Sequence, residues 1–151
     1  MFRGHSYRNM DSKGRLMLPP EFRDHIVAGD DDGRLMLTNF DGCVVGYTVP
    51  EWEAIERSFY EANNSSKKIR AFQRFFIGGA MDVQLDKQGR ILVPPYLRQY
   101  ASLDREVVLA GVGRKFEIWS QALFEAQRQE VEEDFDSVMD ELAANGMGMR
   151  L

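Results

Sequence analysis

Two ten-residue segments carry the same arrangement of hydrogen-bonding residues. The first, "DSKGRLMLPP", begins at Asp11, and the second, "DKQGRILVPP", begins at Asp86. Each places a carboxylate four residues before an arginine, Arg15 or Arg90, with a glycine directly before that arginine. Arginine offers five donors in a planar fork that fits guanine O6 and N7 in the DNA major groove, and such a pairing contributes about 1–3 kcal/mol of discrimination. The two arginines are therefore candidates for reading DNA bases.

The aspartates of the two motifs are expected to have a structural role, because phosphate would repel them. Asp bonds its own following backbone and Gly takes positive φ, so "DSKG" and "DKQG" are turn sequences. We expect Asp11 and Asp86, together with Gly14 and Gly89, to shape the turns and steady the arginines. The alternative is that each Asp–Arg ion pair only closes a turn. A single copy would favour that alternative, whereas two copies in basic surroundings favour DNA contact.

Basic residues near the motifs are candidates for contacts with phosphate, which add affinity and salt dependence without sequence choice. These candidates are Lys13, Lys87, Arg3 and Arg8. The alternative for them is plain solvated surface. A further basic group is more simply interpreted as the exposed face of a helix; it consists of Lys67, Lys68, Arg70 and Arg74.

The motifs belong to an internal repeat. At an offset of 75 residues, "MDSKGRLMLPPEFR" aligns with "LDKQGRILVPPYLR", and six of the fourteen positions are identical: Asp, Gly, Arg, both prolines and a final Arg. Further on the offset falls to 72, and "RLMLTNFDGCVVGYTVPEWE" aligns with "EVVLAGVGRKFEIWSQALFE". The three lost residues lie at the turn "AGDDDG", where an insertion is tolerated. Units of about 45 residues are small for independent stability, so we expect the two to share a core.

Each copy predicts the same order of elements. A turn leads into a short strand, a double proline stops the strand, and the second proline begins a short helix. Two more strands then form a hairpin, and a helix closes the unit. The expected strands are 15–19, 34–40, 43–49, 90–94, 106–111 and 116–120. The expected helices are 20–26, 51–62, 95–101 and one long helix from a cap at Ser120 to about Ala144.

One more helix is expected between the copies. It would start at Asn64 or Ser65 and end at Gly78–Gly79, where glycines commonly terminate a helix. Its apolar face would consist of Ile69, Phe72 and Phe76.

The composition, 44% hydrophobic and 28% charged, is that of a soluble globular protein. The longest apolar runs, such as "EVVLAGVG", are far shorter than the roughly 20 residues of a membrane span, so no membrane partner is expected. The segment "MFRGHSYRNM" lacks the apolar stretch of a secretion signal. Cys43 is the single cysteine, which we expect to be a buried thiol in a reducing cytoplasm.

The net charge of −5 is unevenly distributed. Residues 125–141 hold eight carboxylates and only one basic residue, Arg128, so the rest of the chain carries a net charge of +2. A phosphate backbone senses charge within a Debye length of about 8–10 Å, so the local field matters more than the total. The acidic balance therefore does not exclude a nucleic-acid partner.

These features together resemble a known family. A strand–turn–strand carrying D-x-x-x-R, followed by a short helix and a hairpin, resembles the AbrB-type swapped-hairpin barrel of bacterial regulators. Two such units, beginning "MFRG" and continuing with "DSKGRLMLPPEFR", resemble the MraZ family, which leads the bacterial division and cell-wall gene cluster. The likeness extends from Met1 to about Ala144.

The resemblance implies a fold class and a division into parts. The fold would be α+β, with two tandem AbrB-like swapped-hairpin units sharing a small β-barrel and helices at its periphery. The parts would be a first unit over 4–52, a helical linker over 53–78, a second unit over 79–124 and an acidic C-terminal helix with a tail over 125–151.

The resemblance also implies a function. The chain would be a sequence-specific transcriptional regulator in the cytoplasm, associated with the nucleoid, that binds double-stranded DNA through Asp11–Arg15 and Asp86–Arg90 and assembles into a ring. The two motifs differ between the aspartate and the arginine, with "SKG" in the first copy and "KQG" in the second. The lysine is thus the second residue after the aspartate in the first copy (Lys13) and the first residue after it in the second (Lys87), so the two loops need not touch DNA identically.

The doubled unit further predicts the form of the DNA site. If the first unit of one copy contacts the second unit of the next, the contact is heterologous and closes into a ring where the rotation allows. Such a ring presents its loops in one direction, which favours short direct repeats upstream of its own operon at about one helical turn of 10–10.5 bp.

Two other classes of function were considered. The same barrel serves antitoxins that bind a toxin through an extended tail, and copurification of a stoichiometric second protein would favour that class. An enzyme is not expected, because the sequence shows no paired carboxylates in an apolar setting, nucleophile motif or P-loop. Neither metal nor cofactor is expected.

Overall fold

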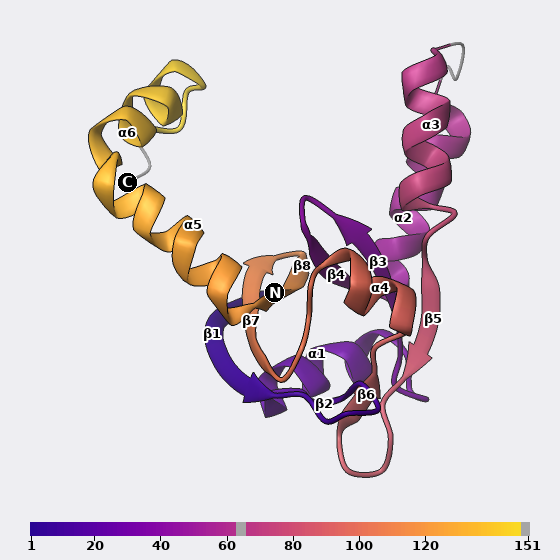
Figure 1. Cartoon of the computed structure of the whole chain (residues 1–151). Helices are drawn as coiled ribbons and strands as arrows, with labels where there is room; N and C mark the ends of the chain where they lie inside the picture. The colour runs from indigo at the N-terminus through magenta and orange to yellow at the C-terminus, as the bar shows by residue number, and fades with distance from the viewer. Residues whose placement is uncertain (63–65, 149–151) are drawn as a thin grey trace. The chain divides into compact units, whose positions relative to one another are not determined.

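The computed structural model describes residues 1–62 and 66–148, and it divides into two compact units, Met1–Ser120 and Gln121–Leu151. The first unit, called the body below, contains a six-stranded antiparallel sheet in the order β1-β7-β8-β4-β3-β5 and a two-stranded ribbon of β2 and β6 (Figure 1). Its strands are β1 (Phe2–Asn9), β2 (Arg15–Met17), β3 (Arg34–Phe40), β4 (Cys43–Thr48), β5 (Met81–Gln84), β6 (Arg90–Leu92), β7 (Glu106–Gly113) and β8 (Lys115–Ser120). Its helices are α1 (Pro20–Gly29), α2 (Val49–Glu61), α3 (Lys67–Phe76) and α4 (Pro95–Tyr100).

The two sequence repeats are interleaved in the body. The first strand of the first repeat, β1, pairs with β7 of the second repeat, and β5 of the second repeat pairs with β3 of the first. The short strands that follow the motifs, β2 and β6, pair with each other. The shared core and the α+β class are thus confirmed, whereas closure into a swapped-hairpin barrel stays a prediction.

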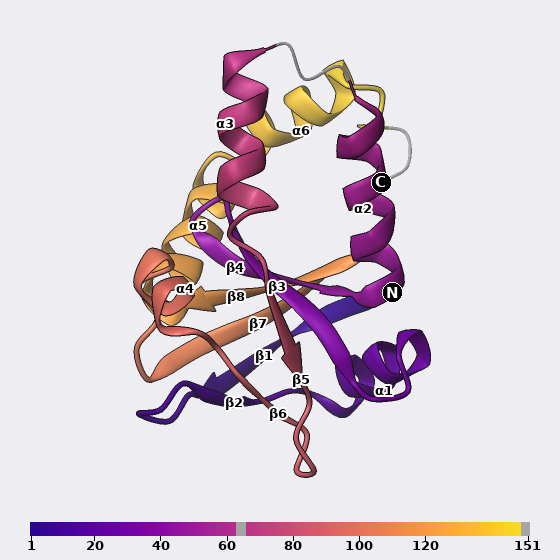
Figure 2. The same ribbon diagram turned by 90° about the vertical axis from the view of Figure 1, so that its right-hand side faces the viewer.

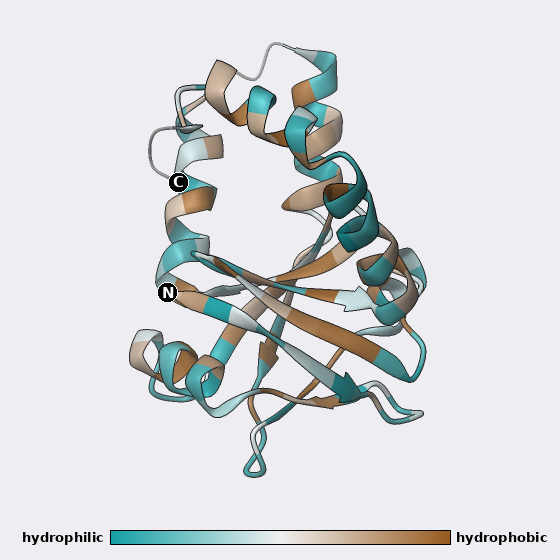
Figure 3. Ribbon diagram, turned by 90° about the vertical axis from the view of Figure 1, so that its left-hand side faces the viewer, coloured by the Kyte–Doolittle hydropathy of each residue, from teal (hydrophilic) through white to brown (hydrophobic). Residues whose placement is uncertain are grey.

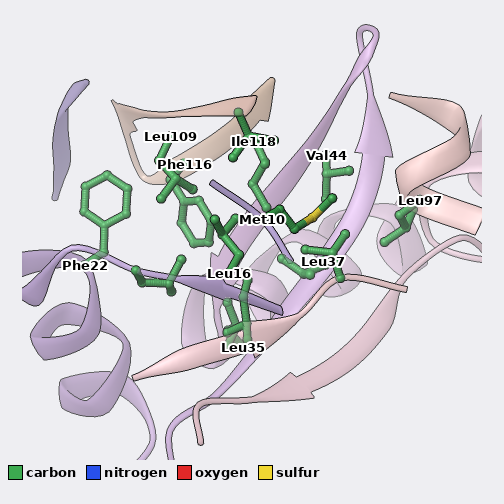
Figure 4. Close-up of a cluster of buried hydrophobic side chains, with 14 of the residues drawn as sticks. Met10, Leu16, Phe22, Leu35, Leu37, Val44, Leu97, Leu109, Phe116 and Ile118 are labelled. Atoms are coloured by element: carbon green, nitrogen blue, oxygen red, sulfur yellow. The ribbon is translucent and has the colours of Figure 1, made fainter. Parts of the chain in front are cut away.

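A hydrophobic core lies where strands of both repeats meet. Leu16 of β2 and Ile91 of β6 are 0% and 1% exposed, and Phe116 and Leu37 from the large sheet lie in the same cluster. Figure 4 shows Leu16 among side chains that come from the sheet and from the segment leading to β2. Hydrophobic residues run along the strands, while the tips of the loops are mostly hydrophilic (Figure 3). The core therefore fixes one face of the ribbon and leaves the other toward solvent.

The two hairpins follow the predicted pattern, with differences of one or two residues at strand ends. Asp41 and Gly42 turn β3 into β4 with φ of 56° and 84°, the conformation that a two-residue Asp-Gly turn adopts. Strand β7 continues to Gly113, beyond the predicted end at residue 111. Strands β1 and β5 were not predicted from the residues, because Phe2 is the only buried residue of β1 and none of the four residues of β5 is buried.

Helices α2 and α3 lie together on the side of the large sheet away from the ribbon (Figures 1 and 2). The predicted apolar face of α3 is confirmed at Phe72 and Phe76, whose rings stack with centroids 5.3 Å apart, whereas Ile69 is 40% exposed. The predicted start at Asn64 or Ser65 lies outside the described residues; the hydroxyl of Ser66 accepts a bond from the backbone N–H of Ile69.

The second unit contains two helices, α5 (Gln121–Glu133) and α6 (Phe135–Ala144). The prediction of one long helix is therefore wrong, because the chain leaves helical geometry at Asp134, with φ −122° and ψ 35°. Carboxylates four residues apart, such as Glu130 and Asp134, repel each other and weaken a helix at this point. Among the helices of the described residues, none combines the length and the apolar character needed to cross a membrane.

Candidate nucleic-acid interface

The first motif forms a turn, called motif turn 1 (residues 11–15), that is closed by one carboxylate. Oδ1 of Asp11 accepts hydrogen bonds from the backbone N–H groups of Lys13 at 3.0 Å and Arg15 at 2.8 Å. Oδ2 of Asp11 accepts from Nε of Arg15 at 2.6 Å. The backbone N–H of Gly14 donates to the carbonyl of Asp11 at 3.0 Å. One side chain thus sets both the shape of the turn and the direction of the arginine.

The second motif repeats this geometry as motif turn 2 (residues 86–90). Oδ1 of Asp86 accepts from the backbone N–H groups of Gln88 and Arg90, both at 2.9 Å, and Oδ2 accepts from Nε of Arg90 at 2.9 Å. Hydrogen bonds from the backbone N–H groups of Arg15 and Arg90 are the main reason why the pKa values of Asp11 and Asp86 are lowered. The expected structural role of the two aspartates agrees with these contacts.

The ribbon of β2 and β6 brings the two arginines together. Arg15 stands opposite Leu92, and Arg90 stands opposite Met17, in an antiparallel register. Side chains alternate along a strand and directly opposite residues share a face, so these four side chains project from one face while Leu16 projects from the other. Arg15 and Arg90 are diagonal neighbours, with Cα atoms roughly 7–8 Å apart.

Both arginines keep donors for another partner. Their side chains are 41% and 30% exposed. Nε of Arg15 and Nε of Arg90 each donate a hydrogen bond to an aspartate. Within residues 1–62 and 66–148, the terminal nitrogens Nη1 and Nη2 of both arginines donate none. Those terminal nitrogens are the part of the guanidinium that can reach a base edge or a phosphate.

Each motif turn is also supported by an arginine from the other repeat. A Cβ placed at Gly14 would lie 2.7 Å from Nε of Arg98, and a Cβ at Gly89 would collide with the side chain of Arg23. Gly14 and Gly89 have φ of 90° and 81°, so their expected role in shaping the turns agrees with both backbone and packing. Nε of Arg98 donates to the carbonyl of Val93 at 3.0 Å.

Arg23 and Arg98 were not among the site residues predicted from the motifs. They are equivalent across the repeat and form its sixth identical position, so the signal was present in the alignment. The alignment did not reveal that each arginine packs on the turn of the other copy, because that exchange depends on how the repeats interleave.

The four phosphate candidates do not lie together. Lys13 and Lys87 are exposed within motif turns 1 and 2. Arg8 is half-buried on β1, where its Nε donates to the hydroxyl of Ser6 at 2.7 Å. Arg3 is exposed on the same strand but lies eight residues before the first motif, roughly 26 Å away along an extended chain. The two lysines therefore lie beside the arginines, and Arg3 does not.

The basic group of Lys67, Lys68, Arg70 and Arg74 belongs to α3. Because α3 and the ribbon lie on different sides of the large sheet (Figure 2), this group does not extend the surface that carries the motif arginines. The interpretation as a separate helix face agrees with that placement.

A third Asp-x-x-Gly-Arg turn occurs at residues 30–34 and is called the acidic turn. Asp30 accepts from the backbone N–H of Arg34, and Gly33 has φ of 73°, as in the motif turns. Here both carboxylate oxygens of Asp30 hold the guanidinium, from Nε at 3.3 Å and Nη2 at 3.0 Å. The turn geometry alone thus does not define the candidate interface; the terminal nitrogens and the position on the ribbon do.

The whole sequence is similar to that of known proteins. The family model described as "MraZ protein, putative antitoxin-like" matches residues 1–75 and again residues 76–145. A protein of Solidesulfovibrio magneticus named "Transcriptional regulator MraZ" is 57% identical over 151 residues, which is 99% of each chain.

Two further relatives carry the same name. The protein of Maridesulfovibrio salexigens is 50% identical over 146 residues, which cover 97% of this chain and 96% of the relative. The protein of Nitratidesulfovibrio vulgaris is 50% identical over 147 residues, which cover 97% of both chains. The double match of the family model and the identity along nearly the full length show that the chain belongs to the MraZ family.

Proposed function

We propose that this protein is a sequence-specific DNA-binding transcriptional regulator that inserts the ribbon of β2 and β6 into the major groove. The observation that supports this most is the pair Arg15 and Arg90 on one exposed face, each aimed by an aspartate and each with free terminal nitrogens. A major groove about 12 Å wide admits a two-stranded ribbon. The Cα atoms of the two arginines lie roughly 7–8 Å apart, which corresponds to about two base steps of about 3.4 Å.

Three further features belong to the proposal. Lys13 and Lys87 hold flanking phosphates, Arg8 adds a weaker contact, and Arg3 contacts phosphate only where the DNA follows β1.

Copies associate head to tail into a ring and bind short direct repeats upstream of their own gene, in the division and cell-wall cluster. The regulator acts in the cytoplasm on the nucleoid. The names of the relatives, which describe transcriptional regulators, support this reading.

A gel-shift assay with DNA from upstream of the protein's own gene tests the proposal. Arg15→Ala and Arg90→Ala are expected to abolish sequence-selective binding while the size of the oligomer in light scattering stays unchanged. Arg114→Ala is the control, because Arg114 is 76% exposed beside the end of β7 that pairs with Phe2, at the end of β1 away from motif turn 1. Selective binding that survives in the double variant Arg15→Ala/Arg90→Ala would refute the proposal.

A further inference from the structure

The exposed face of the ribbon holds two large apolar side chains between the arginines. Leu92 is 53% exposed, and Met17, its equivalent in the first repeat, is half-buried on the same face. The opposite face of the ribbon is closed by Leu16 and Ile91, which are nearly fully buried. Packing of the core therefore does not explain why this face carries leucine and methionine.

The register pairs each apolar side chain with an arginine of the other repeat. Arg15 stands opposite Leu92, and Met17 stands opposite Arg90. Directly opposite side chains in an antiparallel pair have Cβ atoms about 4.5–5.5 Å apart. A surface that binds the guanidinium of Arg15 or of Arg90 must therefore also accept the apolar side chain that stands opposite that arginine.

One feature of the major groove presents that combination. Guanine offers the acceptors O6 and N7, and thymine offers the only apolar group on the groove edge of the bases, its C5-methyl. An arginine with an apolar neighbour at this spacing matches a guanine with a thymine methyl within one or two steps. A phosphate would be met by the arginine alone, and it would leave Leu92 against water or charge.

We infer that Leu92, supported by Met17, determines sequence specificity by contacting thymine C5-methyl groups next to the guanines read by the arginines. This inference rests on the proposed function, because it assumes that the ribbon face meets the major groove. It assigns a share of base recognition to residues outside the D-x-x-x-R motifs.

DNA without thymine methyl groups provides the test. The fragment upstream of the protein's own gene is amplified with dTTP or with dUTP, which yields duplexes of the same base-pairing sequence with or without the methyl. The dissociation constant of each duplex is measured for the wild type, Leu92→Ala, Leu92→Met and Leu123→Ala. The ratio of the two constants reports how much a protein depends on the methyl groups.

The wild type is expected to bind the uracil duplex about four-fold more weakly for each methyl group that it covers. In Leu92→Ala this ratio should fall toward one, while Leu92→Met, which copies the residue of the first repeat, should keep most of it. Leu123→Ala removes a leucine that is 43% exposed on α5 and should keep the wild-type ratio. A general change in DNA shape caused by uracil would instead persist in every variant.

Three results would overturn the inference. The first is equal binding of both duplexes by the wild type. The second is a wild-type ratio in Leu92→Ala. The third is a changed size of the oligomer in Leu92→Ala with an unaltered ratio, which would place Leu92 between copies of the chain. If the wild type showed no selective binding even to the thymine duplex, the proposed function would fail as well, and that result is distinct from the first three.

Discussion

Arg98 of the second repeat lies against Gly14 of the first, so close that a Cβ at Gly14 would stand 2.7 Å from its Nε and 2.8 Å from the carbonyl oxygen of Val93. Arg23 of the first repeat has the reciprocal position at Gly89. Each motif turn is thus built on a side chain from the other copy. The two turns are coupled through the ribbon, and damage at one glycine is expected to reach both repeats.

Substitution of Gly14 by alanine should lower stability more than substitution of Gly4. Both glycines have positive φ, 90° and 93°, but a Cβ at Gly4 has nothing within 4 Å. Gly4→Ala should therefore cost only the backbone strain, about 1–2 kcal/mol in the free energy of unfolding. Gly14→Ala should cost that and the collisions with Arg98 and with the carbonyl oxygen of Val93. Urea unfolding of the two variants measures the difference, and equal costs would show that the close packing around Gly14 is irrelevant to stability.

The carboxylates of Asp11 and Asp86 should stabilise the protein in a defined pH range. Their pKa values lie below the ordinary 3.8, chiefly because backbone N–H groups of Arg15 and Arg90 bond the charged form. Folded-state pKa values below the unfolded ones give stability that is complete above about pH 3.8 and is lost as pH falls through the folded values.

When the pH is lowered from 5 through the folded-state pKa values of the two aspartates, the free energy of unfolding should therefore fall less in the double variant Asp11→Asn/Asp86→Asn than in the wild type. The measurement is the urea midpoint across these pH values. Asp41→Asn removes one carboxylate that lies outside the motif turns and controls for the loss of a single negative charge elsewhere. A double variant with the acid sensitivity of the wild type would contradict the linkage.

The acidic turn should weaken DNA binding at motif turn 2. It adjoins that turn, because the backbone N–H of Leu85 donates to the carbonyl of Gly33 at 2.9 Å and the side-chain amide of Gln84 donates to the carbonyl of Asp32. At the equivalent place beside motif turn 1, Met10 donates to the carbonyl of Arg105. Three aspartates, Asp30 to Asp32, thus stand beside motif turn 2, whereas Arg105 stands between Asp104 and Glu106 beside motif turn 1. Phosphate near motif turn 2 therefore meets the more negative surroundings.

Asp31→Asn/Asp32→Asn is consequently expected to tighten binding at low salt by several-fold, with little effect at high salt, where screening is short-ranged. Asp41→Asn is again the matched control, since Asp41 lies at the far end of β3 from the acidic turn. Titrations at two salt concentrations check the expectation. Unchanged affinity at low salt would place the DNA away from residues 30–34.

Lys13 and Lys87 should contribute to affinity without contributing to sequence choice. Each is exposed within a motif turn, so Lys13→Ala and Lys87→Ala should each reduce the slope of log K against log salt by about one per binding unit. Arg3→Ala should change the slope less, because Arg3 lies far along β1. The slopes come from titrations over a range of salt concentrations, and an Arg3 effect as large as that of Lys13 would mean that DNA follows β1.

Much of the local structure was predictable because it depends on short-range chemistry. The turn at Asp11 follows from an aspartate that bonds the next backbone groups and a glycine that takes positive φ. The helices that begin at Pro20 and Pro95 follow from prolines suited to a first helical position. The single predicted helix at the C-terminus failed at Asp134, where like charges accumulate beyond what the hydrophobic pattern reports.

By itself the sequence determined that the D-x-x-G-R turns at residues 11–15 and 86–90 are equivalent in a repeat and that each leads into a short strand, which carries Leu16 or Ile91. Only the tertiary structure decided that β2 pairs with β6, which places Arg15 and Arg90 on one face, and that Arg98 supports Gly14. The physical reason is that turns and caps form between residues a few positions apart. The pairing of strands 75 residues apart is selected instead by the burial of both hydrophobic faces in one core.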